Sequence, residues 1–202
     1  MKLEARFVTS APSLAGCPRW ELPEIAFTGR SNAGKSSLIN ALTATKGLAR
    51  TSKTPGRTRL LNFFAAGEYL ALVDLPGYGY ARMPEVEATK VAAMTSEYLD
   101  SRRNLIALVV VIDARRAPER EEFALVEAMA QSGRGILIAG TKCDKLKRSE
   151  RATASRRLAQ LSRDVILCSA LDNEGLDDIR RRLLEWSREN APHPRGAAAK
   201  ES

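Results

Sequence analysis

The stretch GRSNAGKS at residues 29–36 constrains this chain more than any other. It fits the pattern G-x-x-x-x-G-K-[ST] and stands between a predicted strand at residues 24–28 and a helix predicted to open at residue 36. Glycines let the backbone wrap closely, so that its N–H groups point at a phosphate, and the helix N-terminus adds the positive end of its dipole. The stretch therefore predicts a phosphate-binding loop between a strand and a helix.

The remainder of the chain alternates between strand patterns and helical patterns. We predict strands at residues 24–28, 59–64, 69–73, 105–112, 135–140 and 165–168. We predict helices at residues 36–42, 84–101, 118–131, 147–162 and 174–188. This order predicts an α/β fold, a three-layer sandwich with helices on both faces of a mostly parallel six-stranded sheet that has one antiparallel edge strand. Ligands of such folds bind beyond the carboxyl ends of the strands.

Two segments supply candidate groups for a nucleotide triphosphate and its metal. Lys35 is placed to bridge the β- and γ-phosphates, and the Ser36 hydroxyl to ligate Mg²⁺. Asp74 and Gly77 follow the strand at residues 69–73, in the sequence DLPG. An aspartate at that place steadies Mg²⁺, often through water, and the glycine N–H meets the γ-phosphate.

The segments TKCD at residues 141–144 and CSA at residues 168–170 follow the last two predicted strands. The Asp144 carboxylate can accept hydrogen bonds from both N1–H and the 2-amino group of guanine, a donor pair that adenine lacks. The Lys142 stem can cover the base, and backbone N–H groups of the CSA segment can meet the guanine O6. Thr141 stands where asparagine is common, which we expect to weaken one supporting contact. Together with the phosphate loop, these segments predict guanine specificity.

The segment at residues 46–58 is long, basic and rich in small polar residues, as a switch segment should be. Thr54 and Thr58 each offer a hydroxyl to Mg²⁺, and we favour Thr58 because it directly precedes a strand. Lys53, Arg57 and Arg59 contact phosphate or RNA, or are solvated; the sequence leaves these alternatives open.

The length of 202 residues predicts one domain with modest extensions. We expect an N-terminal extension at residues 1–22, a domain at residues 23–188, and a disordered tail at residues 189–202. The net charge is +8, and the segments at residues 25–67 and 145–163 each contain seven basic residues, against none and one acidic residue. Local positive potential favours nucleotides or RNA, although a solvated surface gives the same pattern.

Several classes of protein are disfavoured. The only histidine, His193, lies in the tail, which excludes a His-based catalytic triad, and the three cysteines have unrelated spacings typical of reduced thiols. No signal peptide precedes the first strand, and the longest apolar run, residues 105–112, is far below the roughly 20 residues that cross a bilayer. We therefore expect a cytoplasmic protein that binds no membrane.

Five segments, in this order, resemble the EngB (YihA-type) family of bacterial ribosome-biogenesis GTPases, in the translation-factor-related class of P-loop GTPases. They are GRSNAGKSSLINAL (29–42), TSKTPGRTRLLNFF (51–64), DLPGYGYA (74–81), TKCDKL (141–146) and CSA (168–170). The resemblance covers roughly residues 5–188, and the segments TPGRT and DLPGYGYA are the most specific to this family.

The resemblance implies a P-loop GTPase that binds GTP or GDP with Mg²⁺ and hydrolyses GTP slowly. It implies a monomeric switch in assembly of the large ribosomal subunit, with rRNA and not DNA as partner, that is needed for normal septation and cell division. Metal ligands would be Ser36, Thr58 and Asp74, and catalytic residues Lys35, Thr58, Gly77 and Asn32. The implied nucleotide contacts are Gly29, Arg30, Ser31, Asn32, Ala33, Gly34, Lys35, Ser36, Ser37, Gly56, Arg57, Thr58, Asp74, Leu75, Pro76, Gly77, Thr141, Lys142, Cys143, Asp144, Cys168, Ser169 and Ala170.

Tyr78 occupies the place where many GTPases carry a glutamine that positions the attacking water. We interpret it as a ring that packs and sets the shape of the loop. The missing help then comes from K⁺ held at Asn32, from a group of the ribosome, or from a switch residue such as Thr58. The alternative reading is an RNA-binding assembly factor whose GTP is largely structural. A P-loop kinase or ATPase is disfavoured by Asp144 and by the lack of a separate acceptor-binding domain.

Overall fold

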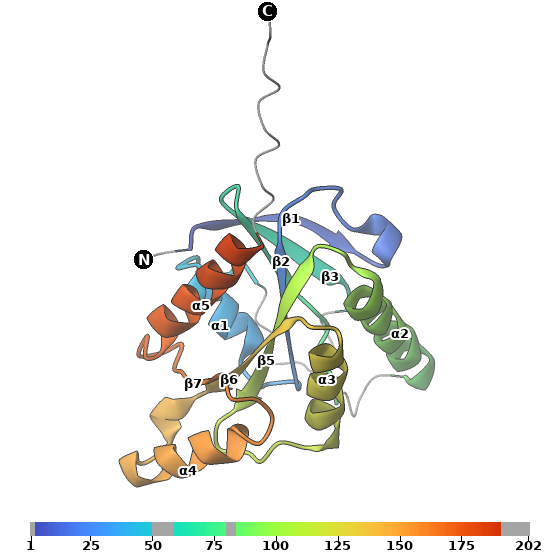
Figure 1. Ribbon diagram of the computed structural model, residues 1–202. Helices are drawn as coiled ribbons and strands as arrows, with labels where there is room; N and C mark the ends of the chain where they lie inside the picture. The colour runs from blue at the N-terminus through green and yellow to red at the C-terminus, as the bar shows by residue number, and fades with distance from the viewer. Residues whose placement is uncertain (1–2, 50–58, 80–83, 191–202) are drawn as a thin grey trace, which may run out of the picture.

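The protein is described by a computed structural model that covers residues 3–49, 59–79 and 84–190. Within those residues the strands form one seven-stranded sheet, in the order β1-β3-β4-β2-β5-β6-β7 (Figure 1). The strands are β1 (Ala5–Ala11), β2 (Glu24–Gly29), β3 (Leu61–Ala66), β4 (Leu70–Asp74), β5 (Leu105–Asp113), β6 (Gly135–Thr141) and β7 (Val165–Leu167). The α-helices are α1 (Lys35–Leu42), α2 (Glu85–Ser101), α3 (Arg120–Gln131), α4 (Arg148–Leu158) and α5 (Leu176–Glu189), and short 3-10 turns are η1 (Leu14–Gly16) and η2 (Cys143–Lys145).

The predicted α/β sandwich is confirmed, and two details of the predicted sheet are wrong. Six strands were expected, but β1 adds a seventh by pairing antiparallel with β3. The antiparallel strand β3 was expected at the edge, but it lies between β1 and β4. Residues 5–11 gave no clear strand pattern because most of this edge strand is partly or fully exposed and only Ala11 is buried. The segment expected as an extension thus contributes to the sheet of the main domain.

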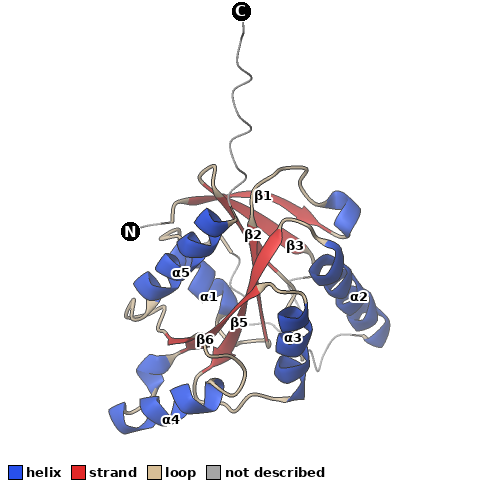
Figure 2. Ribbon diagram, viewed as in Figure 1, coloured by secondary structure: helices blue, strands red, loops and turns tan. Residues whose placement is uncertain are grey.

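Helices cover both faces of the sheet (Figure 2). Apolar side chains of α1 and α5 pack on one face, in a core that includes Phe27 and Val109. Those of α2, α3 and the α4 region pack on the other face, in a core that includes Phe63 and Val110. Because β5 is covered on both faces, its sequence LVVVI is continuously apolar rather than alternating.

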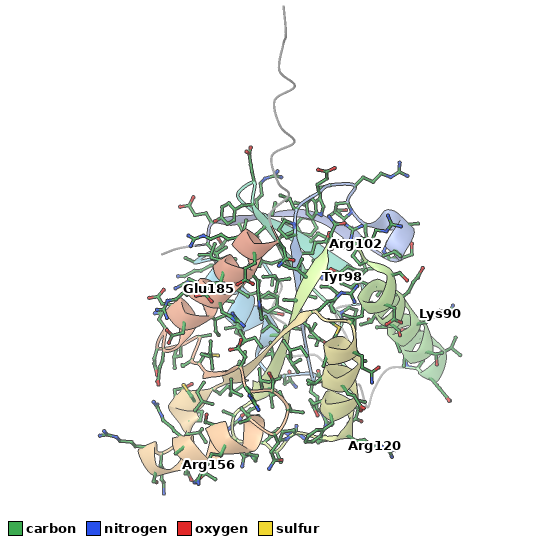
Figure 3. The ribbon with its side chains drawn as sticks, viewed as in Figure 1. Lys90, Tyr98, Arg102, Arg120, Arg156 and Glu185 are labelled. Carbon is green, nitrogen blue, oxygen red and sulfur yellow. The ribbon has the colours of Figure 1, made fainter. Side chains whose placement is uncertain are left out.

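A buried polar cluster fastens the amino end of β2. The Glu24 carboxylate is fully buried and accepts hydrogen bonds from Tyr98 Oη (2.8 Å), Trp20 Nε1 (2.7 Å) and Arg102 Nε (3.0 Å). Tyr98 and Arg102, labelled in Figure 3, come from α2 and the residue that follows it. The cluster fixes α2 and the chain before β2 to the sheet at the end remote from the predicted ligand site.

The carboxyl ends of the parallel strands meet at the opposite edge. Registers between β2, β4, β5 and β6 bring Gly29, Asp74, Asp113 and Thr141 to that edge. A Cβ at Gly29 would stand 2.3 Å from the carbonyl oxygen of Val111, so only glycine lets β2 and β5 pair as closely here. The predicted site residues therefore leave the sheet at one edge.

Candidate nucleotide-binding site

The phosphate loop joins β2 to α1 with a backbone that turns back on itself. Asn32 and Gly34 have φ angles of 66° and 97°, and the Ala33 N–H donates to the Arg30 carbonyl at 3.0 Å. Helix α1 begins at Lys35, and its N-cap Gly34 has no side chain to cap the first N–H groups. The first turn of an α-helix leaves such groups without intrahelical acceptors. This geometry gives an anion the donors and the helix dipole that the sequence predicted.

Lys35 and Asp74, 39 residues apart in the sequence, meet at the mouth of the loop. The Lys35 ammonium forms an ion pair with the Asp74 carboxylate, and both residues are buried. Beyond Asp74 the backbone continues beside β2, since the Leu75 N–H donates to the Phe27 carbonyl at 3.0 Å. Leu75 and Pro76 are buried and Gly77 is half-buried. The loop thus carries Gly77 along the phosphate loop.

The predicted base-recognition residues come together from two strands. The Asp144 carboxyl, in η2 after β6, has its pKa raised by burial, but hydrogen bonds from Ser169 and from Lys145 outweigh that effect and leave the pKa below its usual value. The Cys143 N–H donates to the Cys168 carbonyl at 3.2 Å, which ties the two segments together. Ala170 follows directly, so the structure groups the TKCD and CSA segments at one end of the site.

Thr141 and Lys142 fasten the phosphate loop. The Thr141 hydroxyl contacts the carbonyl oxygens of Ala33 and Ile112, and Lys142 Nζ donates to the Asn32 carbonyl at 2.7 Å. We expected threonine to weaken a supporting contact, and that expectation was wrong, because the hydroxyl reaches the loop directly. The Lys142 ammonium supports the loop, and its backbone takes a left-handed conformation with φ of 59°.

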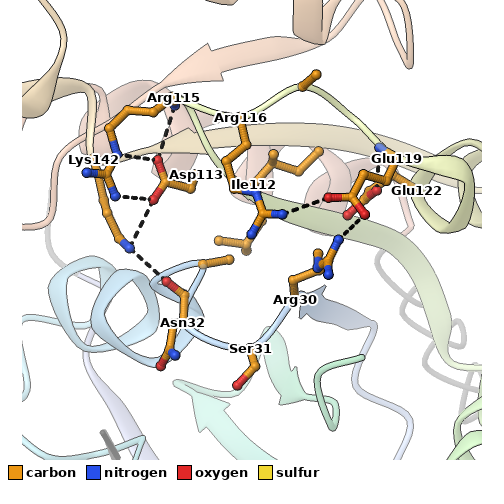
Figure 4. A pocket seen from close by; sticks show the side chains of 13 residues that line it. Arg30, Ser31, Asn32, Ile112, Asp113, Arg115, Arg116, Glu119, Glu122 and Lys142 are labelled. Atoms are coloured by element: carbon orange, nitrogen blue, oxygen red, sulfur yellow. Dashed lines mark hydrogen bonds and ion pairs between the residues drawn. The ribbon is translucent and has the colours of Figure 1, made fainter. Parts of the chain in front are cut away.

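Asp113 is a site residue that the sequence reasoning missed. It ends β5 and pairs with Arg115 Nη2 at 2.6 Å and with Lys142 Nζ at 3.1 Å (Figure 4). Burial raises the pKa of the carboxyl, but hydrogen bonds from Arg115 and Lys142 outweigh it and hold the pKa far below its usual range. The available signal was a lone carboxylate at the end of the apolar run 105–112, at the same sheet edge as the motifs.

A cavity of about 450 Å³ lies between the phosphate loop, the end of β5 and α3 (Figure 4). Arg30, predicted to contact nucleotide, lines this cavity and pairs with Glu119 at the N-cap of α3, as Arg116 does at 2.7 Å. Its guanidinium is thus directed to α3. Asn32 is exposed, and its side chain points away from the cavity in Figure 4.

Tyr78 is turned toward α3. Its hydroxyl donates to Glu122 Oε1 at 2.8 Å, and it forms a backbone bridge with Arg30. The interpretation of Tyr78 as a ring that sets the loop's shape is confirmed by this docking. Gly56, Arg57 and Thr58, together with the alternative ligand Thr54, lie outside the described residues.

Relatives of known sequence share most of this chain. A family model described as "50S ribosome-binding GTPase" matches residues 24–142. A protein of Geobacter metallireducens named "Probable GTP-binding protein EngB" is 45% identical over 89% of this chain and 90% of its own length. One of the same name from an Anaeromyxobacter species is 41% identical over 98% of each.

The chain belongs to the EngB family of GTPases. It therefore binds GTP and GDP, and it hydrolyses GTP.

Solved structures agree with this fold. A crystal structure titled as a probable GTP-binding protein engB has a TM-score of 0.67 at 23% identity, covering 82% of this chain and 99% of the other. Era from Aquifex aeolicus, a second GTPase, also gives 0.67 at 19% identity, over 83% of this chain and 57% of its own. In the part of the chain that the structure describes, every helix is too short or too polar to traverse a lipid bilayer.

Proposed function

We propose that this EngB GTPase is a cytoplasmic, monomeric switch in assembly of the large ribosomal subunit, required for normal septation and cell division. The observation that carries the proposal is the ion pair of Lys35 with Asp74, which places a phosphate-binding cation and a metal-binding carboxylate together at the start of α1. The family model, described as ribosome-binding, supports the choice of partner.

The residues at the loop fit a magnesium nucleotide. Mg²⁺ favours oxygen ligands and takes one or two protein groups plus phosphate oxygens, and Ser36 and Asp74 offer a hydroxyl and a carboxylate beside the N-terminus of α1. When bound, Mg²⁺ neutralises charge that develops on the phosphates. Thr58 is the proposed third ligand. Lys35 would leave Asp74 for the phosphates, and the Gly77 amide would meet the γ-phosphate.

At the other end of the site, Asp144 would hold the guanine. Its carboxylate already has a reduced pKa because hydrogen bonds from Ser169 and Lys145 outweigh burial, so it is ionised and acceptor-only at neutral pH. The small residues Ser169 and Ala170 would let backbone N–H groups approach the guanine O6. Arg30, Ser31, Asn32, Ala33, Gly34 and Ser37 would complete the phosphate contacts through their backbone.

Since the hydroxyl of Tyr78 is bonded to Glu122, hydrolysis needs another aid. We propose K⁺ held by the exposed Asn32 side chain, which would add positive charge beside the phosphates. Equal GTP turnover in K⁺ and Na⁺ buffers of matched ionic strength would remove this part of the proposal.

The test of the switch is co-sedimentation with purified ribosomal subunits, with the protein bound to a non-hydrolysable GTP analogue or to GDP. We expect it to pellet with the large subunit in the GTP-analogue state and to remain in the supernatant with GDP. Equal sedimentation in both states, or preference for the small subunit, would contradict the proposal.

A second candidate function is an RNA-binding assembly factor whose GTP is largely structural. The exposed basic side chains in and just before α4, such as Lys147, Arg148 and Arg156, favour contact with RNA whatever the nucleotide state. Multiple-turnover phosphate release, with and without ribosomal particles at saturating GTP, separates the two. Stimulation by particles supports the switch, and an unchanged rate supports the structural role.

A further inference from the structure

The hydroxyl of Tyr78 and the carboxylate of Glu122 form a buried pair that the nucleotide site does not use directly. Glu122, in the first turn of α3, is 3% exposed, although glutamate is rarely buried without a partner. Its Oε1 accepts from Tyr78 Oη at 2.8 Å, and its Oε2 accepts from the Glu119 N–H at 2.7 Å. Both oxygens are thus occupied, one by the DLPGYG loop and one by the backbone of α3.

The backbone of Tyr78 is fixed to the phosphate loop as well. Its N–H donates to the Gly29 carbonyl at 3.3 Å, and its carbonyl accepts from the Ser31 N–H at 3.2 Å. Arg30, between these two residues, reaches α3 through Glu119. Tyr78 therefore joins three segments: the phosphate loop by its backbone, α3 by its side chain, and the DLPGYG loop by its place in the chain.

The position of Tyr78 limits the position of Gly77. Consecutive Cα atoms are about 3.8 Å apart, so a fixed Tyr78 leaves the preceding amide little freedom to move. A buried carboxylate costs free energy that an apolar residue would avoid, and such groups are often kept for a defined geometry rather than for stability. Burial, followed by the charge and hydrogen bond of Glu122, raises the pKa of Tyr78, so the phenol remains a donor at physiological pH.

We propose that Tyr78 and Glu122 are positioning residues for GTP hydrolysis, whose hydrogen bond holds the Gly77 amide where it meets the γ-phosphate. The inference rests on the role proposed above for Gly77. It assigns to α3, which carries no nucleotide-binding motif, the support of the γ-phosphate contact. GDP lacks that phosphate, so the pair should matter for GTP and not for GDP.

The chain contains a matched control at the other end of the sheet. Tyr98 Oη donates to the buried Glu24 carboxylate at 2.8 Å, the same distance as in the Tyr78–Glu122 bond. Tyr78→Phe and Tyr98→Phe therefore each remove one hydroxyl and leave one buried carboxylate oxygen without its tyrosine donor. Only the first of these bonds lies beside the phosphate loop.

The experiment measures the affinity for GDP and for a non-hydrolysable GTP analogue, kcat and Tm for both variants. We expect Tyr78→Phe to weaken the GTP analogue and lower kcat by about tenfold each, a loss of the size of one charged hydrogen bond. GDP affinity should stay within about twofold. Tyr98→Phe should lower Tm with no change in the ratio of the two affinities.

An unchanged ratio in Tyr78→Phe, or an equal change in Tyr98→Phe, would overturn the inference. Glu122→Gln provides a second variant if Tyr78→Phe does not fold, because its amide group cannot accept from both Tyr78 and Glu119 as a carboxylate does. It should shift the ratio in the same direction. Gly77→Ala separates the two levels: if it leaves the ratio unchanged, the proposed role of Gly77 fails; if it alone changes the ratio, only the role of Tyr78 and Glu122 fails.

Discussion

Asp144 illustrates how a single side chain is prepared for its ligand. Its carboxylate sits at the start of η2, and Ser169, from the segment after β7, holds it by a hydrogen bond. A carboxylate with its position fixed loses less conformational entropy when a base binds. The same pair would hold the two acceptor oxygens toward the donor edge of guanine.

We expect Asp144→Asn to lower GTP affinity by about tenfold to a hundredfold, because a charge-assisted acceptor pair is lost. Relative affinity for xanthosine triphosphate, which lacks the 2-amino donor, should rise. Competition binding with the two nucleotides measures both effects. Asp172→Asn changes an exposed acid of the nearby loop and serves as control; equal nucleotide preference in both variants would show that Asp144 is not at the base.

Asp113 gives a prediction about pH. Because hydrogen bonds from Arg115 and Lys142 outweigh burial, its folded pKa lies below the ordinary value of 3.8. Its stabilising contribution is therefore fully present above that value and is lost as the pH falls below it toward the folded pKa. We expect Asp113→Asn to lower the free energy of unfolding by about 1–2 kcal/mol at pH 7 and pH 5.

The difference between wild type and Asp113→Asn should shrink below pH 4, since the wild-type carboxyl then begins to protonate in the folded state. Urea unfolding at pH 7, 5 and 3 measures it. Asp100→Asn, on the exposed face of α2, should show no such trend. A difference that is constant down to pH 3 would mean that the ion pairs of Asp113 do not stabilise the fold.

At the scale of elements, β2 and α2 depend on one buried ion pair. Arg102, directly after α2, donates to Glu24 at the start of β2, and it also holds the Pro18 carbonyl at 2.8 Å. Removing one partner would leave the other charge buried and unpaired. The pair therefore joins the chain before β2, the central strand and α2 into one unit.

We expect Arg102→Ala to lower the free energy of unfolding by about 3–5 kcal/mol, as is typical when one member of a buried ion pair is removed. Arg103→Ala, at the exposed neighbouring position, should change it by less than about 0.5 kcal/mol. Urea denaturation compares the two. Similar small losses in both variants would mean that Glu24 finds other donors.

Elements were predictable from the sequence where one periodicity or one motif defines them. The unit from β2 through the phosphate loop to α1 has both, and it was found at its observed position. β1 was missed because an edge strand shows only a weak alternation of exposure. The contacts of Tyr78 with Glu122 and of Asp113 with Lys142 were out of reach, since each joins residues far apart in the sequence through the packing of α3 or β5.

At the scale of the whole molecule, the distribution of charge matters more than the total of +8. Exposed Arg148 and Arg156 lie on α4, on the other side of the molecule from Lys90 on α2 in the view of Figure 3. Phosphate contacts release counterions, so binding to RNA weakens as salt rises. A basic face of this kind suits a large polyanionic partner.

We expect the fraction that sediments with large ribosomal subunits to fall steadily as KCl rises, and the double variant Arg148→Gln/Arg156→Gln to bind more weakly and with a smaller salt slope. Loss of two phosphate contacts would lower the slope by about two. Lys90→Gln/Arg120→Gln removes the same charge from α2 and α3 and is the control. Equal weakening of both would indicate an effect of net charge alone.

The tethers on the phosphate loop also bear on the order in which the protein becomes active during its own synthesis. The carbonyl groups of Ala33 and Asn32 are held by Thr141 and Lys142, 108 and 110 positions later in the chain. A nascent chain that ends before β6 has made the loop but not the residues that hold its outer side. The chain therefore completes its nucleotide site only after more than two thirds of its 202 residues have been translated, so that tight binding of GTP reports a nearly finished molecule.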